Sequence, residues 1–74
     1  MKLTDREHEV VTNIYGNDTP RDLRAIETEQ LVTIHNQVSQ AIANCYAEET
    51  VDRDSLGIFL PLEGKLGQVL YDRL

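Results

Sequence analysis

Residues 28–49 read TEQLVTIHNQVSQAIANCYAEE, and we expect the rest of the chain to pack around this segment. Its apolar residues recur at alternating steps of three and four, which places them on one face of a helix. Thr28 is a residue type that caps helices, and the carboxylate of Glu29 suits the positive end of a helix. We therefore predict one long helix over residues 28–49. Its core face is expected to consist of Leu31, Ile34, Val38, Ala41, Ile42 and Cys45.

The opposite face of this helix is polar but uncharged. No Lys, Arg, Asp or Glu occurs between Gln30 and Ala47, whereas solvated helix faces usually carry Lys and Glu. Charge depletion is typical of the centre of protein interfaces. The pattern therefore predicts contact with a partner, and the alternatives are a neutral exposed face and a face covered by the rest of the chain. The predicted contact residues are Thr33, Asn36, Gln37, Gln40 and Asn44, with Val32, Ser39 and Tyr46 beside them.

Acidic residues flank the same helix. The chain has 13 Asp and Glu against 7 Lys and Arg, for a formal charge of −6, which argues against direct binding to nucleic acid or to an anionic membrane. A protein with a basic surface is the expected partner. Tyr46 is the predicted anchor, because aromatic side chains dominate many interfaces. The acids expected to meet the basic surface are Glu27, Glu29, Glu48, Glu49, Asp52 and Asp54.

Two shorter helices are expected before the long one. Thr4 and Glu7 form a capping-box pattern, and Gly16 is suited to end that first helix. Thr19 and Pro20 then predict a new start, with a short helix over residues 21–26 and a break near residues 27–28. A single continuous helix over residues 20–49 is the alternative. The inward residues of these two helices are expected to be Leu3, Val10, Val11, Ile14, Leu23 and Ile26.

The C-terminal third is less periodic. After a polar connection over residues 50–55, residues 56–60 are predicted to form a helical turn that inserts Phe59 into the core. Pro61 is expected to open a last helix, in which Gly64 and Gly67 allow close packing of another helix. The inward residues of this helix are expected to be Leu62, Leu66, Val69, Leu70 and Leu74.

These elements predict an all-α fold, a small bundle of three to five helices in a single domain over residues 1–74. Cys45 is the only cysteine, so no internal disulfide can form. The chain contains neither the apolar run of a signal peptide nor the roughly 20 apolar residues of a membrane helix. We expect a cytoplasmic protein.

Little in the sequence indicates catalysis. Cys45 and His35 are about 15 Å apart if residues 28–49 are helical, and no phosphate-binding glycine loop or HExxH motif is present. Residues 52–63 place acids and Gly57 as in an EF-hand calcium loop, but Leu56 and Leu60 replace two oxygen ligands. We predict no enzymatic activity, no cofactor and no metal.

Residues 3–11, LTDREHEVV, are similar to the opening of the helix-turn-helix domain of LuxR-type response regulators. The resemblance implies DNA binding. However, a recognition helix brings Lys or Arg to the groove, and no basic residue occurs between Arg24 and Arg53.

The sequence thus favours a small acidic helical protein that binds and modulates or inhibits a larger protein, such as a nucleic-acid-handling enzyme. In size and charge alone it resembles the inhibitors that phages and plasmids direct against such host enzymes. One alternative is a homodimeric assembly module, in which the neutral face pairs with its own copy. Another is a small DNA-binding regulator.

Overall fold

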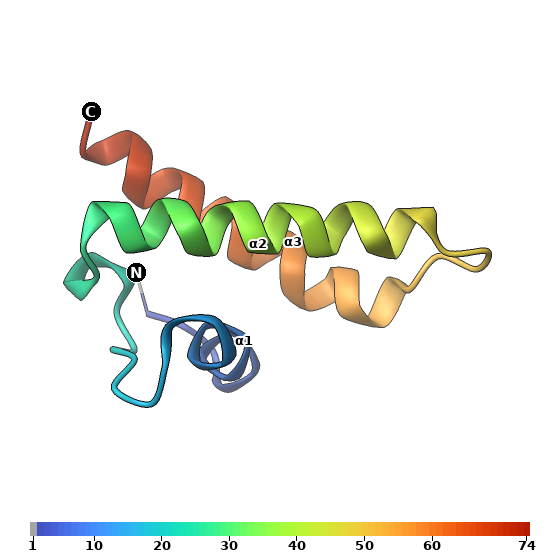
Figure 1. Ribbon diagram of the computed structural model, residues 1–74, viewed down its shortest axis with the longest axis horizontal. Coiled ribbons are helices and arrows are strands. Elements are labelled where there is room, and N and C mark those ends of the chain that lie inside the picture. Colours follow the sequence, from blue (N-terminus) through green and yellow to red (C-terminus); the bar gives the residue numbers. More distant parts are fainter. Residues whose placement is uncertain (1) are drawn as a thin grey trace.

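The computed structural model describes residues 2–74, which form three α-helices and one short 3-10 helix (Figure 1). These are α1 (Asp5–Tyr15), η1 (Leu23–Ala25), α2 (Thr28–Ala47) and α3 (Arg53–Asp72). α2 and α3 run in opposite directions and cross, while α1 lies beneath one half of α2. The described part measures 37 × 26 × 16 Å. The predicted small all-α bundle is confirmed.

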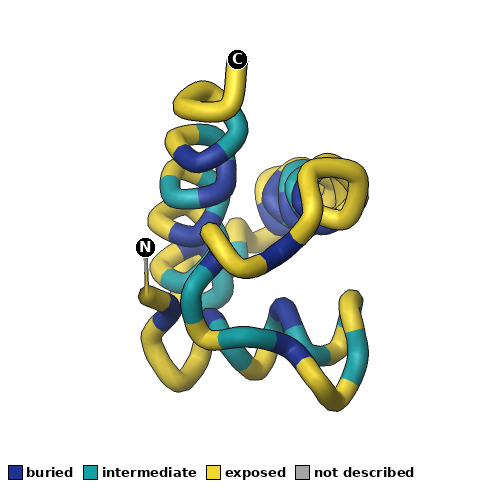
Figure 2. Tube along the Cα trace, turned by 90° about the vertical axis from the view of Figure 1, so that its left-hand side faces the viewer, coloured by how far each residue is buried: buried dark blue, intermediate teal, exposed yellow. Residues whose placement is uncertain are grey.

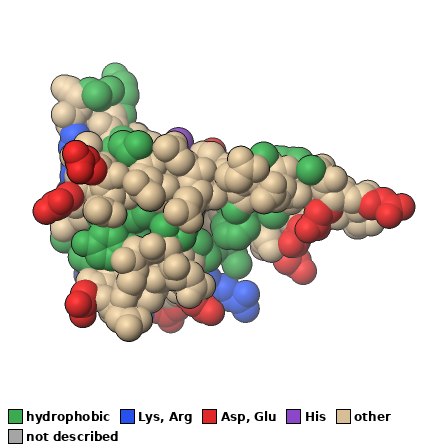
Figure 3. Space-filling view, viewed as in Figure 1, with side chains coloured by type: hydrophobic (Ala, Val, Ile, Leu, Met, Phe, Trp, Pro, Cys, Tyr) green, Lys and Arg blue, Asp and Glu red, His purple; other side chains and the backbone are tan. Residues whose placement is uncertain are grey.

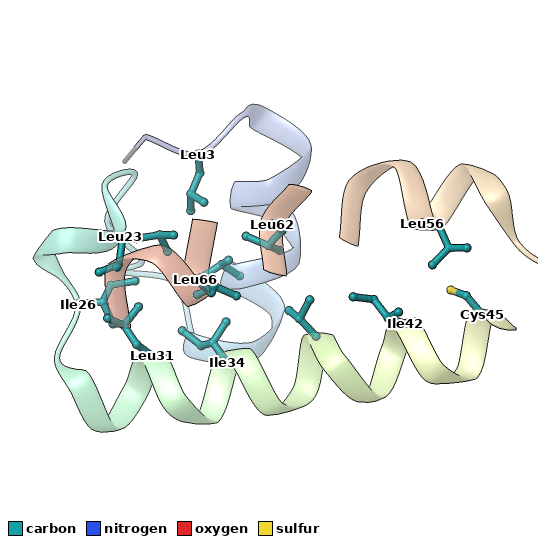
Figure 4. Packing of buried hydrophobic residues seen from close by; sticks show 13 residues of the cluster. Leu3, Leu23, Ile26, Leu31, Ile34, Ile42, Cys45, Leu56, Leu62 and Leu66 are labelled. Carbon is teal, nitrogen blue, oxygen red and sulfur yellow. The ribbon is translucent and has the colours of Figure 1, made fainter. Parts of the chain in front are cut away.

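The core lies where the buried faces of α2 and α3 turn toward each other above α1 (Figure 2). The predicted stripe of α2 is buried except for Ala41, which is half-buried. Toward the α2–α3 connection the core thins to Ile42, Cys45 and Leu56 (Figure 4). The side chains that are almost fully buried gather at the opposite end and include Leu23, Ile26, Leu31, Ile34, Leu62 and Leu66.

The predicted signals of α1 are confirmed. Thr4 Oγ1 accepts a hydrogen bond from Glu7 N at 3.2 Å, and Glu7 Oε1 accepts one from Thr4 N at 2.9 Å. Gly16 ends the helix with φ +126°, and its N–H donates to the carbonyl of Thr12. Any other residue would be strained at this φ angle, so the backbone conformation requires glycine at this position.

The predicted break before α2 is also confirmed, but both threonine caps are wrong. Thr19 is buried, and its hydroxyl donates to the carbonyl of Gly16. The helical turn starts later, where Asp22 accepts from Arg24 N at 3.0 Å. Thr28 is the first residue of α2, and its hydroxyl accepts from Arg73, which follows α3, at 3.0 Å. A local contact in the turn engages the hydroxyl of Thr19, and a tertiary contact engages that of Thr28, so neither caps a helix.

α3 differs most from the prediction. It begins at Arg53, capped by Asp52, and continues through Pro61 without a break. Pro61 was expected to open the helix, because a proline in a helix interior removes one hydrogen bond. Leu56 before it and Leu62 after it are both buried in the core shared with α2. This burial outweighs the cost of the lost bond, which is about 3 kcal/mol. Phe59 packs against the core from within the helix.

Two further expectations for α3 are wrong. A Cβ atom added at Gly64 or Gly67 would meet no atom within 4 Å, so neither glycine lets another part of the described chain approach closely. Leu74, expected inside, is fully exposed because α3 ends at Asp72. The remaining inward residues of α3 are buried or half-buried as expected.

One buried ion pair joins the first and last helices. Glu7 is only 3% exposed, and its Oε1 lies 2.6 Å from Lys65 Nζ. Burial raises the pKa of Glu7, but hydrogen bonds from Lys65 and from the backbone of Thr4 outweigh it and hold this pKa below the usual 4.5. The ionised carboxylate therefore links the N-terminus of α1 to the middle of α3.

This pair predicts acid sensitivity. A carboxylate whose pKa is lower in the folded than in the unfolded chain stabilises the fold above the unfolded pKa, and this stabilisation is lost as the pH falls. We expect the free energy of unfolding, measured by urea titration with circular dichroism, to fall as the pH drops below 4.5. The loss between pH 7 and pH 3 should be smaller in Glu7→Gln. An equal loss in both proteins would contradict this role of Glu7.

Candidate protein-binding surface

The outer face of α2 is open along the whole helix. All five predicted contact residues are exposed: Thr33, Asn36, Gln37, Gln40 and Asn44. Figure 3 shows this face toward the viewer as a band of uncharged side chains and backbone. The rest of the described chain does not cover the face, so one of the alternatives left open by the sequence is excluded. We call these five residues the neutral face.

Hydrogen bonds within α2 order part of the neutral face. Gln40 Nε2 donates to Asn44 Oδ1 at 3.0 Å, and Thr33 Oγ1 donates to the carbonyl of Glu29 at 3.2 Å. The side-chain amides of Asn36 and Gln37 have no partner among residues 2–74. Each amide offers donors and an acceptor to a second molecule. The face is therefore suited to polar contacts that do not involve charge.

The three residues predicted beside the neutral face have different surroundings. Val32 is 43% exposed and Tyr46 is 56% exposed. Ser39 is half-buried, and its hydroxyl donates to Glu63 Oε2 of α3 at 2.6 Å, so the structure removes it from the contact surface. Val32 and Tyr46 lie on the flank of α2 that faces α3, and each lines a separate shallow hollow.

Acidic side chains lie at both ends of α2. Glu27 and Glu29 are exposed at its start, and Glu48 and Glu49 are exposed at its end. Twenty helical residues span about 30 Å, so the two acidic ends are separated by roughly that length. None of the four makes an ion pair with the described residues. Their charges remain available to a partner.

Asp52, the cap of α3, and Asp54, in its first turn, have different roles. Asp54 is exposed. Asp52 caps α3, where its carboxylate accepts from Ser55 N at 3.1 Å and from Ser55 Oγ at 2.6 Å. These bonds lower the pKa of Asp52. Asp52 therefore has a structural role, and its carboxylate is less available to a partner than that of Asp54.

The EF-hand spacing does not form a loop. Residues 53–63 are helical, Asp52 caps that helix and Glu63 binds Ser39. Within residues 2–74, no group of three or more His, Cys, Asp or Glu is placed to hold a metal ion. The thiol of Cys45 is buried, and burial together with the charges of Asp52 and Glu48 raises its pKa. This environment disfavours the reactive thiolate.

Sequence reasoning missed an apolar hollow beside Tyr46. Val51 from the connection and Leu60 and Pro61 from α3 line it, and Val51 and Leu60 are 37% and 44% exposed. The signal was present in residues 56–60, where uninterrupted apolar residues exceed what one face of a helix can bury. Because these residues were predicted to form one turn inserted into the core, no apolar residue among them was expected to remain exposed.

Among residues 2–74, no helix combines the length and the apolar character that crossing a membrane requires. Comparison with known proteins gives no significant match to a family model, a curated protein or a solved structure.

Proposed function

We propose that this protein binds a larger protein through the neutral face of α2 and thereby modulates or inhibits it. The observation that supports this most is the exposure of all five uncharged residues along one helix. An exposed helix face without charge is unusual for a surface that contacts water alone. Depletion of charge at the centre, with polar and charged residues at the rim, is typical of protein interfaces.

The acidic ends of α2 indicate the chemistry of the partner. A basic surface would meet Glu27 and Glu29 at one end and Glu48 and Glu49 at the other, which accelerates association and aligns the two molecules. Proteins that handle nucleic acids carry basic surfaces of this kind. Binding there would place carboxylates where the phosphates of the nucleic acid otherwise lie. We therefore propose a nucleic-acid-handling protein as the target and inhibition by occupation of its basic surface.

Replacing Gln40 by lysine tests the neutral face. A lysine at its centre introduces a charge that must be desolvated on binding and that repels a basic partner. We expect affinity to fall about tenfold or more, with little change in thermal stability because Gln40 is exposed. Asn17→Lys, in the exposed turn after α1, is the control with the same change in net charge.

The measurement is capture of proteins from a host lysate on the immobilised chain, followed by elution with rising salt and mass spectrometry. The affinity of the recovered protein is then measured for the unchanged protein, for Gln40→Lys and for Asn17→Lys. If Gln40→Lys and Asn17→Lys weaken binding equally, only net charge matters and the neutral face is not the contact.

A homodimer is the second candidate. It is favoured by a hollow of about 500 Å³ at the start of α2, lined in part by Val32 and His35 of α2 and by Tyr71 of α3, which is 73% exposed. Sedimentation velocity across a concentration series distinguishes the two functions. A monomer at all concentrations excludes the dimer, and a stable dimer would replace the inhibitor as the working function.

A further inference from the structure

The hollow beside Tyr46 is an apolar feature that the neutral face does not explain. It has a volume of about 580 Å³ and is lined mainly by apolar atoms. Tyr46 of α2 and Val51 of the connection line it on one side. The α3 residues that line it are Arg53, Leu56, Gly57, Leu60 and Pro61. Tyr46 is 56% exposed, so its ring extends over the hollow without being buried in it.

The position of the hollow explains why no part of residues 2–74 fills it. The connected ends of α2 and α3 project beyond α1, as Figure 1 shows at the right. The core between them contains only Ile42, Cys45 and Leu56 (Figure 4). This arm is therefore two helices thick, and its outer apolar side chains have no third element to pack against. Exposed apolar patches with polar rims commonly mark sites of interaction.

The chain around the hollow is strongly acidic, although Arg53 is itself among the residues that line it. Residues 46–61 contain Glu48, Glu49, Asp52 and Asp54, and Arg53 is the only basic residue among them. Figure 3 shows acidic side chains at this tip of the molecule and hydrophobic side chains next to them. Two of these charges also affect a neighbouring group. Burial raises the pKa of the Cys45 thiol, and the negative charges of Asp52 and Glu48 raise it further. An occupant with positive charges would be attracted here.

Next to this region, α3 also lacks one of its backbone hydrogen bonds. Pro61 has no N–H, so the carbonyl of Gly57 four residues earlier lacks its usual helical donor. Both residues line the hollow. A Cβ at Gly57 would meet no atom within 4 Å, so the space above it is open. Another chain can therefore approach the backbone of α3 closely at Gly57.

We propose that the hollow receives a basic amphipathic helix of the bound protein. One or two of its aliphatic side chains pack between Tyr46 and Leu60, and its Lys or Arg side chains meet Glu48, Glu49 and Asp54. Gly57 and Leu60 are about one helical turn apart, which matches the spacing of apolar residues on one face of a helix. This inference rests on the proposed function, because it names the element of the partner that binds.

A second copy of the chain fits the hollow poorly. In a two-fold symmetric contact the same patch lies on both sides of the interface. Glu48, Glu49 and Asp54 would then face their own copies, and like charges in direct opposition are destabilising. The acidic rim thus favours a basic partner over self-association at this site.

A designed peptide tests the inference without knowledge of the natural partner. The probe is an 18-residue helix of Leu and Lys, with Leu at the spacing of one helix face, and its control is a scrambled peptide of equal composition. Each is added to the ¹⁵N-labelled protein, and amide signals are followed by NMR. We expect saturable shifts centred on residues 46–60 with the amphipathic peptide and at least tenfold weaker binding of the scrambled one.

Two glycine variants of the protein provide matched controls. Gly57→Leu fills the hollow, whereas Gly64→Leu places the same side chain outside it on the exposed side of α3. Both should fold, because leucine favours a helix more than glycine and a Cβ has room at both positions. We expect Gly57→Leu to weaken peptide binding at least tenfold and Gly64→Leu to change it less than twofold.

Three results would overturn the inference: equal shifts with the scrambled peptide, equal effects of the two glycine variants, or shifts that follow the protein's own concentration without peptide. The last would assign the hollow to a second copy. The captured partner separates this inference from the proposed function. If Gln40→Lys releases that partner and Gly57→Leu retains it, only the hollow is misassigned. If neither variant changes its binding, the proposed function fails as well.

Discussion

Leu66→Ala is expected to remove about 3 kcal/mol from the free energy of unfolding. Leu66 is fully buried and lies among the largest buried side chains of α2, α3 and the η1 region (Figure 4). Its truncation removes apolar contacts and leaves a cavity that three elements would have to move together to close. For a chain of 74 residues, the total stability is only about 4–11 kcal/mol. The variant should therefore lose a large share of it.

The measurement is thermal and urea unfolding followed by circular dichroism. A loss of this size corresponds to a fall in melting temperature of about 12–24 °C for a small domain. Leu60→Ala is the control in the same helix, because Leu60 is 44% exposed and does not belong to the core cluster. If the two variants were equally stable, the packing described for α3 would be incorrect.

Glu7→Ala is expected to cost about 2–4 kcal/mol. The substitution leaves Lys65, whose side chain is only 29% exposed, without its carboxylate and also removes half of the capping box of α1. A cation that is left partly buried and unpaired is costly, which is why breaking such a pair destabilises a protein more than the pair itself stabilises it.

Asp5→Ala provides the comparison, since Asp5 pairs with Arg21 at the same distance of 2.6 Å but on the exposed surface. Exposed pairs of this kind contribute little, so Asp5→Ala should change stability far less. A double-mutant cycle between Glu7 and Lys65 isolates the coupling between them. Equal losses from Glu7→Ala and Asp5→Ala would show that burial of the pair has no energetic consequence.

Local signals were sufficient to predict α1 and α2. The core stripe of α2 follows directly from its periodicity, and the capping box of α1 needs only Thr4 and Glu7, three residues apart. Such signals arise from neighbours in the sequence, so they survive in the folded chain. The exposure of the neutral face was predictable for the same reason, since it lies opposite a buried stripe.

The predictions that were wrong or incomplete concern contacts between residues that are distant in the sequence. The path of α3 through Pro61 depends on the burial of Leu56 and Leu62 against α2, which overrides the local preference for a break. Ser39 is bound by Glu63, 24 residues away, and Glu7 by Lys65, 58 residues away. A single sequence contains no record of these pairings. The hollow beside Tyr46 was missed because it exists only between two helices and their connection.

The most direct test of the proposed function observes the neutral face itself. In the ¹⁵N-labelled protein, the side-chain amide groups of Asn36, Gln37, Gln40 and Asn44 give their own NMR signals, and the captured partner can be titrated against them. We expect these four signals to shift or broaden together, while that of Gln68 on α3 stays unchanged. If the four signals do not move while the partner binds, the protein uses another surface and the neutral face is not its interface.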